Sequence, residues 1–214
     1  MCLVGLVFCL CVPSLRRSLS LREWKLSFSP GFFLGLTLVL QNYGLQYTSI
    51  AKSGFITCLY VITVPLISRF FLKHRLPHNH FIWVLVSLVG AALVCELDSF
   101  RWNGGDALTL ACSFAAALQI LEVGRLCSRS KSPFVFTLGQ AFWASLLPLA
   151  GAWAWESLPA AVPPKAWWGL AELVFGASLL SFFIQLRAQR ILSASTVSLL
   201  FLLESPFAAF FGFW

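Results

Sequence analysis

The chain has 214 residues, of which 59% are hydrophobic and only 11% are charged, and its mean hydropathy is +0.84. A soluble domain typically carries about 25% charged residues, so this composition excludes a water-soluble globular fold and indicates an integral membrane protein. The formal net charge is +7, but no stretch combines basic residues with a polar face, which argues against nucleic acid as a partner. The apolar runs are long and do not alternate as β-barrel strands do, so the sequence predicts an all-α fold embedded in a lipid bilayer.

Apolar runs follow one another along the chain, and a membrane-spanning helix needs about 20 such residues. A short run comes first, at 2–13. Seven full-length candidates follow, near 31–48, 53–72, 81–97, 106–124, 134–155, 167–186 and 194–214. The sequence therefore predicts a bundle of seven to eight transmembrane helices.

Basic residues are distributed unequally between alternate loops. One set of loops holds twelve of the 15 Lys and Arg residues, namely Arg16, Arg17, Arg22, Lys25, Arg69, Lys73, Arg75, Arg125, Arg129, Lys131, Arg187 and Arg190. The other set holds Lys52, Arg101 and Lys165. Positively charged loops stay on the cytoplasmic side. The first set is therefore expected to be cytoplasmic, with residue 1 outside, in a multi-pass protein of the cell (inner or plasma) membrane.

The residues that commonly bind metals or carry out catalysis form no recognisable motif in this sequence. The seven cysteines form no CxxC pair, which argues against a disulfide framework or a zinc site. His74, His78 and His80 have a spacing that suggests a metal, but Pro77 interrupts them and basic residues surround them, which favours a solvated loop. The sequence has no P-loop, GxSxG or HExxH motif. It therefore predicts no enzyme, no cofactor and no ATP hydrolysis.

Two segments, 44–53 and 187–196, share a local pattern. Each has a helix end, a Gln, a short polar turn and an Ala that opens the next helix. Gln46 and Gln189 mark a spacing of 143 residues. The loop charges place the first turn outside and the second in the cytoplasm. Equivalent segments of opposite orientation are typical of inverted-repeat transporters.

Several short motifs also occur in a characteristic order. They are QNYGLQYTS at 41–49, GFIT at 54–57, VPL at 64–66, NGGDALTL at 103–110, AQRILSAS at 188–195 and LESPFAA at 203–209. With these motifs the chain resembles the drug/metabolite transporter superfamily, in its EamA branch. The resemblance implies an inverted-repeat helix bundle of ten helices in two repeats. Residues 1–100 would be an incomplete first repeat, and 101–214 a second repeat without its last helix, so this chain is expected to be part of a longer protein.

The same resemblance implies a function. It predicts a gradient-driven permease or exporter of small metabolites or drugs, which binds its substrate near the membrane midplane between the two repeats. The sequence does not determine the oligomeric state, for which a homodimer is one alternative. The alternative is a membrane subunit without transport activity, or a truncated remnant of a transporter. An intramembrane enzyme is disfavoured, since no paired catalytic set is found.

Acidic residues within predicted spans are candidates for the substrate pathway, because an ionisable side chain there costs about 2.5–3.5 kcal/mol. Glu122 lies one turn after Gln119 and three residues before Arg125, so it either lines a cavity with Gln119 or pairs with Arg125. Glu204 lies beside Pro206 in the middle of a span. It is either a proton or substrate contact, or a buried acid bonded to a neighbouring helix.

Polar uncharged residues form a second group of candidates. Gln41 and Gln140 lie in spans, where they either line a cavity or join two helices by hydrogen bonds. Thr57 and Tyr60 share a helix face with Gly54. The predicted pathway consists of Gln41, Thr57, Tyr60, Gln119, Glu122, Gln140 and Glu204.

Overall fold

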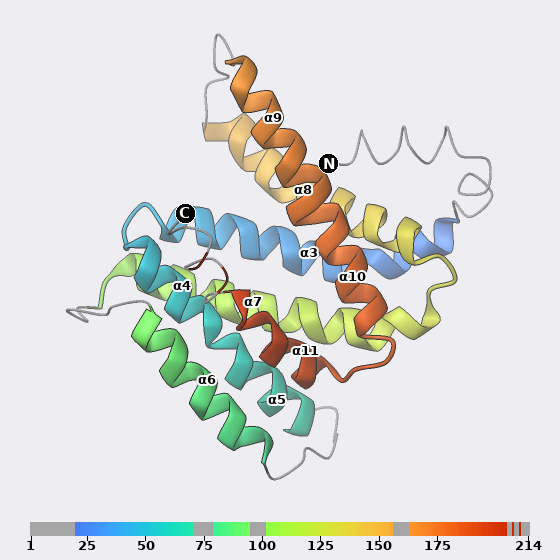
Figure 1. The fold of residues 1–214 in the computed structure, drawn as a ribbon. Coiled ribbons are helices and arrows are strands. Elements are labelled where there is room, and N and C mark those ends of the chain that lie inside the picture. Colours follow the sequence, from blue (N-terminus) through green and yellow to red (C-terminus); the bar gives the residue numbers. More distant parts are fainter. Residues whose placement is uncertain are drawn as a thin grey trace. The chain divides into compact units, whose positions relative to one another are not determined.

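The computed structural model describes residues 20–70, 79–94, 102–155 and 163–204, together with Phe207 and Phe210. Within these ranges the chain is helical and has no strand (Figure 1). The elements are α3 (Leu21–Gly44), α4 (Ile50–Cys58), α5 (Tyr60–Phe70), α6 (His80–Val94), α7 (Gly104–Leu126), the short η1 (Cys127–Arg129), α8 (Pro133–Trp155), α9 (Pro164–Glu172), the π-helical η2 (Leu173–Leu180), α10 (Ser181–Ala188) and α11 (Ala194–Phe201). The predicted all-α class is confirmed.

Four helical stretches of the described chain are long and apolar enough to cross a membrane. They are Ile50–Phe70, Gly104–Arg129, Pro133–Ala154 and Pro164–Ala188. These stretches match four of the predicted spans and confirm a helical membrane protein with several passes. Helix α6 is a shorter apolar helix, Phe81–Leu93 in its apolar part. The predicted run at 2–13 and the ends of the predicted spans 81–97 and 194–214 lie outside the described residues.

Helix α3 corrects the predicted span at 31–48, because it begins at Leu21 and includes two basic residues that were expected in a loop, Arg22 and Lys25. The physical reason is Glu23 in its first turn, which is only 2% exposed. The Glu23 carboxylate accepts hydrogen bonds from the Ser130 hydroxyl at 2.7 Å and the Lys131 N–H at 2.8 Å. Partners for this buried charge allow the helix to continue through the charged segment.

The chain forms two compact units, each made of segments that are distant in sequence. The first comprises residues 1–35 and 122–191, and the second comprises 36–121 and 192–214. The division falls within α3 and within α7. It does not follow the predicted repeats, 1–100 and 101–214, which describe ancestry rather than packing and remain a prediction.

In the first unit, α8 packs against η2 and α10. One buried cluster consists of Val135, Leu138, Ala141 and Leu179, and another of Val123, Leu126, Cys127, Phe136 and Leu186. Helices α3 and α8 approach closely at two glycines. A Cβ atom added to Gly31 would lie 2.6 Å from the Trp143 Cβ, and one added to Gly35 would lie 2.7 Å from the Ala144 carbonyl oxygen. The absence of side chains at these two positions therefore permits the contact.

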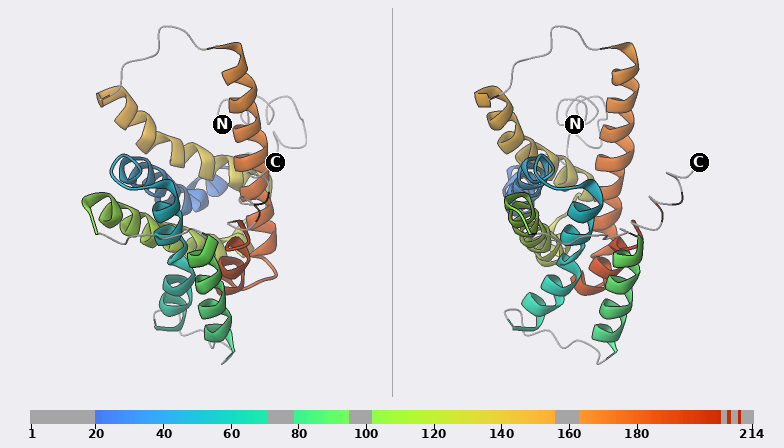
Figure 2. Two further views of the ribbon diagram at one scale, coloured as in Figure 1. Left: turned by 60° about the vertical axis from the view of Figure 1, so that its left-hand side comes forward. Right: turned by 90° about the vertical axis from the view of Figure 1, so that its left-hand side faces the viewer.

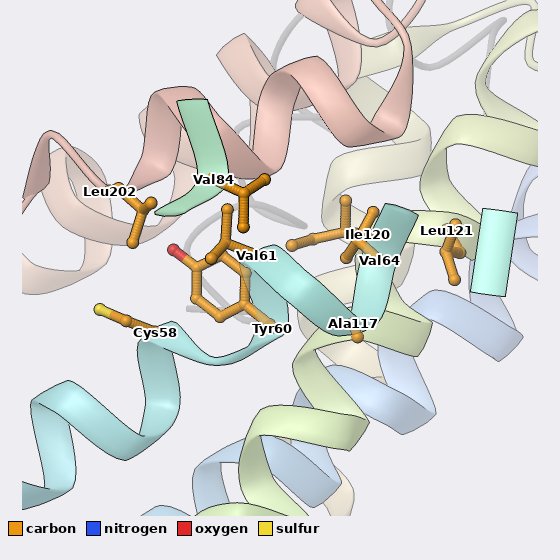
Figure 3. Packing of buried hydrophobic residues seen from close by; sticks show 9 residues of the cluster. All are labelled: Cys58, Tyr60, Val61, Val64, Val84, Ala117, Ile120, Leu121 and Leu202. Carbon is orange, nitrogen blue, oxygen red and sulfur yellow. The ribbon is translucent and has the colours of Figure 1, made fainter. Parts of the chain in front are cut away.

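In the second unit, α11 packs against α5 and α6, and α4 packs against α6. The α4–α5 pair and α11 run in opposite directions in all three views (Figures 1 and 2). Their contact forms the apolar core of the unit, which also includes α7. Its buried members are Cys58, Tyr60, Val61, Val64, Val84, Ala117, Ile120, Leu121 and Leu202 (Figure 3).

Two segments of the chain make the same sequence of backbone hydrogen bonds. In each, a helix ends in a tight turn, a serine caps the next helix, and that helix is then interrupted. At the turn, the bond from Leu45 N–H to Gln41 C=O matches that from Gln189 N–H to Gln185 C=O. At the cap, the bond from Lys52 N–H to the Ser49 hydroxyl matches that from Thr196 N–H to the Ser193 hydroxyl. After the interruption, the bond from Thr63 N–H to Leu59 C=O matches that from Phe207 N–H to Leu203 C=O. Each residue of the second set lies 144 positions after its counterpart, as 185 does after 41. The bonds at the ends of the two helices, Leu59 N–H to Ile56 C=O and Leu202 N–H to Leu199 C=O, are instead 143 positions apart, which is the predicted spacing of Gln46 and Gln189. The offset is thus 144 through the turn and the serine cap, and 143 where each helix is interrupted.

Candidate functional site

Two interrupted helices meet in the second unit. Leu59 separates α4 from α5, and the helical pattern of α11 is broken at Leu202 and Leu203 before it returns at Glu204. In both cases a proline follows closely, at positions 65 and 206. Proline has no N–H and cannot complete the helical hydrogen-bond pattern, which favours an interruption upstream of it. Membrane transporters often place ligands at such discontinuous helices.

Tyr60 and Glu204 occupy corresponding positions in these helices, 144 residues apart. Each is the first helical residue after the interruption. Tyr60 is 8% exposed, and its hydroxyl end points toward Leu202 of α11 (Figure 3). Glu204 is exposed. The interpretation of Glu204 as a buried acid is therefore not what the structure shows.

The other predicted pathway residues are placed as follows. In the second unit, Thr57 is half-buried and donates a hydrogen bond to the Ser53 carbonyl at 2.8 Å, which is a bond within its own helix. Gln41 is half-buried near the end of α3, and Gln119 is buried in α7. Five of the seven predicted residues thus belong to the second unit, and the remaining two, Glu122 and Gln140, belong to the first.

Glu122 has two partners within the first unit. Its Oε2 accepts a hydrogen bond from the Ser29 hydroxyl at 2.6 Å and forms an ion pair with Arg125 at 2.9 Å. Of the two interpretations of Glu122, the ion pair with Arg125 is therefore the one observed. The contact with Ser29 also joins α7 to α3.

Gln140 is 2% exposed on α8, and its Nε2 has no hydrogen-bond partner within the described chain. Ser113 Oγ on α7 and Ser195 Oγ on α11 are in the same situation. Buried polar groups in native proteins usually have partners, and each exception calls for a physical explanation such as strain, a functional role or a water molecule. Gln140 is thus the predicted pathway residue with an unused donor.

A buried ion pair links Lys52 in α4 to Asp106 in the first turn of α7. The distance from Lys52 Nζ to Asp106 Oδ2 is 2.6 Å, and the Asp106 side chain is completely buried. The Thr48 hydroxyl donates to Asp106 Oδ1 at 2.7 Å. The prediction that Lys52 and Asp106 are loop charges is therefore wrong.

The local reason for this placement of Asp106 is a reciprocal cap at the start of α7. The Asn103 N–H donates to Asp106 Oδ2 at 2.7 Å, and the Asp106 N–H donates to Asn103 Oδ1 at 2.9 Å. The N-x-x-D pattern at 103–106 resembles a capping box, which marks the first turn of a helix. This pattern predicts that Asp106 lies in the first turn of the helix rather than in the loop before it.

A second set of polar contacts stabilises the turn that precedes α8. Arg190 Nε donates to the Cys127 carbonyl at 3.2 Å, and its Nη2 donates to the Ser130 carbonyl at 2.8 Å. The sequence predicts Arg190 only as a loop charge. Its contacts show that Arg190 also donates hydrogen bonds to carbonyl groups that follow the end of α7.

Comparisons with known proteins agree with these features. Residues 1–95 match the model of the EamA-like transporter family. The chain is similar to an uncharacterized transporter of Archaeoglobus fulgidus, with 31% identity over 126 residues, or 57% of this chain. The matched region spans 39% of the length of that curated relative.

Proposed function

We propose that this chain is an EamA-type drug/metabolite transporter and acts as a gradient-driven permease or exporter of small metabolites. The match of residues 1–95 to the EamA-like transporter family model and the similarity to an uncharacterized transporter support this proposal. Members of this family are transporters and not, in general, enzymes. The single observation that carries the proposal is the pair of interrupted helices, α4–α5 and α11, which meet around Tyr60 in a shared core. Discontinuous helices of this kind form substrate and ion sites in secondary transporters.

The substrate would bind near the membrane midplane between two inverted repeats. Three features support this arrangement: the backbone hydrogen bonds repeated after 144 residues, the opposite directions of α4–α5 and α11, and the contact between these elements. Cys58 and Leu202 are themselves 144 residues apart and share one buried cluster. Contact between corresponding residues is expected near a two-fold pseudo-symmetry axis.

The energy source and the orientation belong to the same proposal. The sequence contains no P-loop, so an ion gradient rather than ATP is proposed to drive transport. The loops rich in Lys and Arg are proposed to face the cytoplasm of the cell from the inner or plasma membrane.

Reconstitution of the chain in proteoliposomes tests the transport proposal. A panel of labelled amino acids, sugars, nucleotide derivatives and cationic drugs would be offered with an imposed proton gradient and no ATP. We expect accumulation of at least one class, and loss of that accumulation when an uncoupler collapses the gradient. Uptake that requires ATP, or equal uptake in empty liposomes for every compound, would contradict the proposal.

Glu204→Gln is expected to abolish the proton-coupled uptake and to leave membrane insertion intact. The exchange removes the carboxylate next to the helix interruption and preserves the shape of the side chain. Initial uptake rates in proteoliposomes measure the effect, with the amount of reconstituted protein determined in parallel. Glu172→Gln, at an exposed acid of α9, is the matched control and is expected to transport like the wild type. Unchanged uptake by Glu204→Gln would remove Glu204 from the mechanism.

Gln140→Met separates a pathway role of Gln140 from a packing role. Methionine has a similar volume and removes the Nε2 group that has no partner, so stability is expected to stay equal or to increase by up to about 1 kcal/mol. Uptake is nevertheless expected to fall if the amide contacts the substrate. Thermal unfolding and uptake rates of the same preparation provide both values. A loss of stability together with unchanged uptake would assign Gln140 to packing alone.

A further inference from the structure

Four helix ends are held together at one turn of the first unit, the turn between α7 and α8. The start of α3 contacts this turn through Glu23, whose carboxylate accepts hydrogen bonds from the Ser130 hydroxyl and the Lys131 N–H. The segment after α10 contacts the same turn through Arg190, which donates to the Cys127 and Ser130 carbonyls. The ends of α7 and α10 and the starts of α3 and α8 therefore lie together.

Most of the exposed charge at these four helix ends is positive. The acidic residues among the described residues here are Glu23, which is 2% exposed and bonded to the turn, and Glu122, which pairs with Arg125. Six further basic residues are exposed and form no ion pair within the part of the chain that the structure describes. These six residues, here called the basic surface, are Arg22, Lys25, Arg129, Lys131, Arg187 and Arg190.

The basic surface lies at the ends of helical stretches that are long and apolar enough to cross a membrane. Gly104–Arg129 ends at the turn, Pro133–Ala154 begins directly after it, and Pro164–Ala188 ends two residues before Arg190. A stretch of this length spans the hydrocarbon core, so its ends lie at the depth of the lipid headgroups. The charges are therefore placed beside headgroups rather than in bulk water.

Two guanidinium groups of the basic surface are held in place by other parts of the first unit. Arg190 is held by its two carbonyl contacts, and the Arg187 guanidinium carbon lies 6.0 Å from the centre of the Phe183 ring. A side chain that is already ordered loses less conformational entropy when it binds a ligand. Both groups are thus prepared to bind an anion.

We propose that the basic surface binds the headgroups of anionic phospholipids in the adjoining leaflet, which is the cytoplasmic leaflet in the proposed orientation. The phosphodiester group of such a lipid accepts two parallel hydrogen bonds from an arginine guanidinium. The net negative charge of the lipid adds an attraction that a zwitterionic lipid lacks. This inference concerns the surrounding lipid and goes beyond the proposed transport of a substrate.

Native mass spectrometry of the purified full-length chain in detergent tests the proposal, because it counts the lipids bound to each protein molecule. The probes are phosphatidylglycerol and phosphatidylcholine with the same acyl chains. We expect phosphatidylglycerol to bind at least about tenfold more tightly, since each basic residue near the headgroups adds about 1 kcal/mol. We also expect this preference to decrease as the ionic strength rises. Equal affinities for the two lipids would overturn the proposal.

A free anion is distinguished from a lipid by thermal unfolding of the same preparation. Phosphatidylglycerol is expected to raise the unfolding temperature, because a ligand of the folded state stabilises it. Inorganic phosphate at the same concentration is expected to have a smaller effect. Equal stabilisation by both would show that the basic surface binds free phosphate, and would overturn its assignment to lipid.

Single exchanges with a matched control locate the binding. Arg129→Gln is expected to weaken phosphatidylglycerol binding about fivefold, the factor that corresponds to about 1 kcal/mol. Lys165→Gln also removes one exposed positive charge, but Lys165 lies at the start of α9, at the opposite end of Pro164–Ala188 from Arg187. This control is expected to bind both lipids as the wild type does. An equal loss in Arg129→Gln and Lys165→Gln would show a general effect of charge and would contradict a local surface.

Two double variants sample the basic surface from different helices. Arg129→Gln with Lys131→Gln, and Arg22→Gln with Lys25→Gln, are each expected to weaken phosphatidylglycerol binding about 25-fold and to leave phosphatidylcholine binding unchanged. The bond from the Lys131 N–H to Glu23 involves the main chain and is preserved. Unfolding temperatures without lipid are therefore expected to stay unchanged, which excludes unfolding as the cause of lost binding. A preference for phosphatidylglycerol that survives in both double variants would overturn the proposal.

Discussion

Replacing Asp106 with alanine is expected to lower the free energy of unfolding by about 3 kcal/mol, the lower end of the cost of breaking a buried ion pair. The exchange leaves the Lys52 ammonium group, 2.6 Å away in the native chain, without its charged partner. It also removes the acceptor for the Thr48 hydroxyl and for the Asn103 N–H. These contacts join the turn before α4 to the start of α7, so their loss weakens the second unit at one end.

A double-mutant cycle separates the ion pair from its surroundings. Asp106→Ala and Lys52→Met are measured singly and together by reversible unfolding in mixed detergent micelles. The double variant is expected to be more stable than the sum of the two single effects predicts, because it leaves no unpaired charge. Glu172→Gln, an exposed acid, should change stability by less than about 0.5 kcal/mol. Additive effects in the cycle would show that Lys52 and Asp106 do not stabilise each other.

The membrane class and four of the spans could be predicted from the sequence because both depend on composition over long windows. The helical stretches Gly104–Arg129 and Pro133–Ala154 begin within a few residues of the predicted spans 106–124 and 134–155. The start of α3 could not be predicted in this way. Its first turns are charged, and only the contacts of Glu23 with Ser130 and Lys131, more than 100 positions away, explain why they are helical.

The partners of individual side chains were harder to predict from the sequence than the positions of the helices. For Glu122 the partner in the same helix, Arg125, was among the predicted alternatives because i,i+3 spacing is visible in sequence. The partner from another helix, Ser29, was not. Lys52 and Asp106 were assigned to loops because the positive-inside rule counts charges near helix ends without regard to burial. Long-range pairs depend on the packing of helices, which hydropathy does not encode.

Tyr60 and Glu204 show what the sequence can predict about single residues and what it cannot predict about their relation. Both residues were predicted pathway candidates, each from the chemistry of its own segment. Their equivalence was not visible in the sequence, where the local pattern has a spacing of 143, whereas the hydrogen bonds of the turn and of the serine cap are 144 positions apart. A shift of one residue moves a helical position by about 100° around the axis and therefore changes which side chains correspond.

The second large effect is expected from Gly35→Ala, which should lower the free energy of unfolding by about 1–3 kcal/mol, the usual cost of overpacking. The added Cβ would lie 2.7 Å from the Ala144 carbonyl oxygen and 3.1 Å from the Ala144 Cα, both of them backbone atoms that cannot rotate away. Helices α3 and α8 would have to separate. The contact between the Trp143 Nε1 and the Trp24 carbonyl, 3.0 Å in the native chain, would be strained by that movement.

Gly90→Ala provides the matched control for this exchange, because Gly90 also lies inside a helix but has no atom within 4 Å of the added Cβ. Alanine is a better helix former than glycine, so Gly90→Ala is expected to raise the free energy of unfolding by about 0.5–1 kcal/mol. The same chemical change thus has opposite signs at two positions, and unfolding curves in one detergent measure both. Stabilisation by Gly35→Ala would mean that α3 and α8 do not approach at this glycine, whereas opposite signs would locate their contact at residue 35.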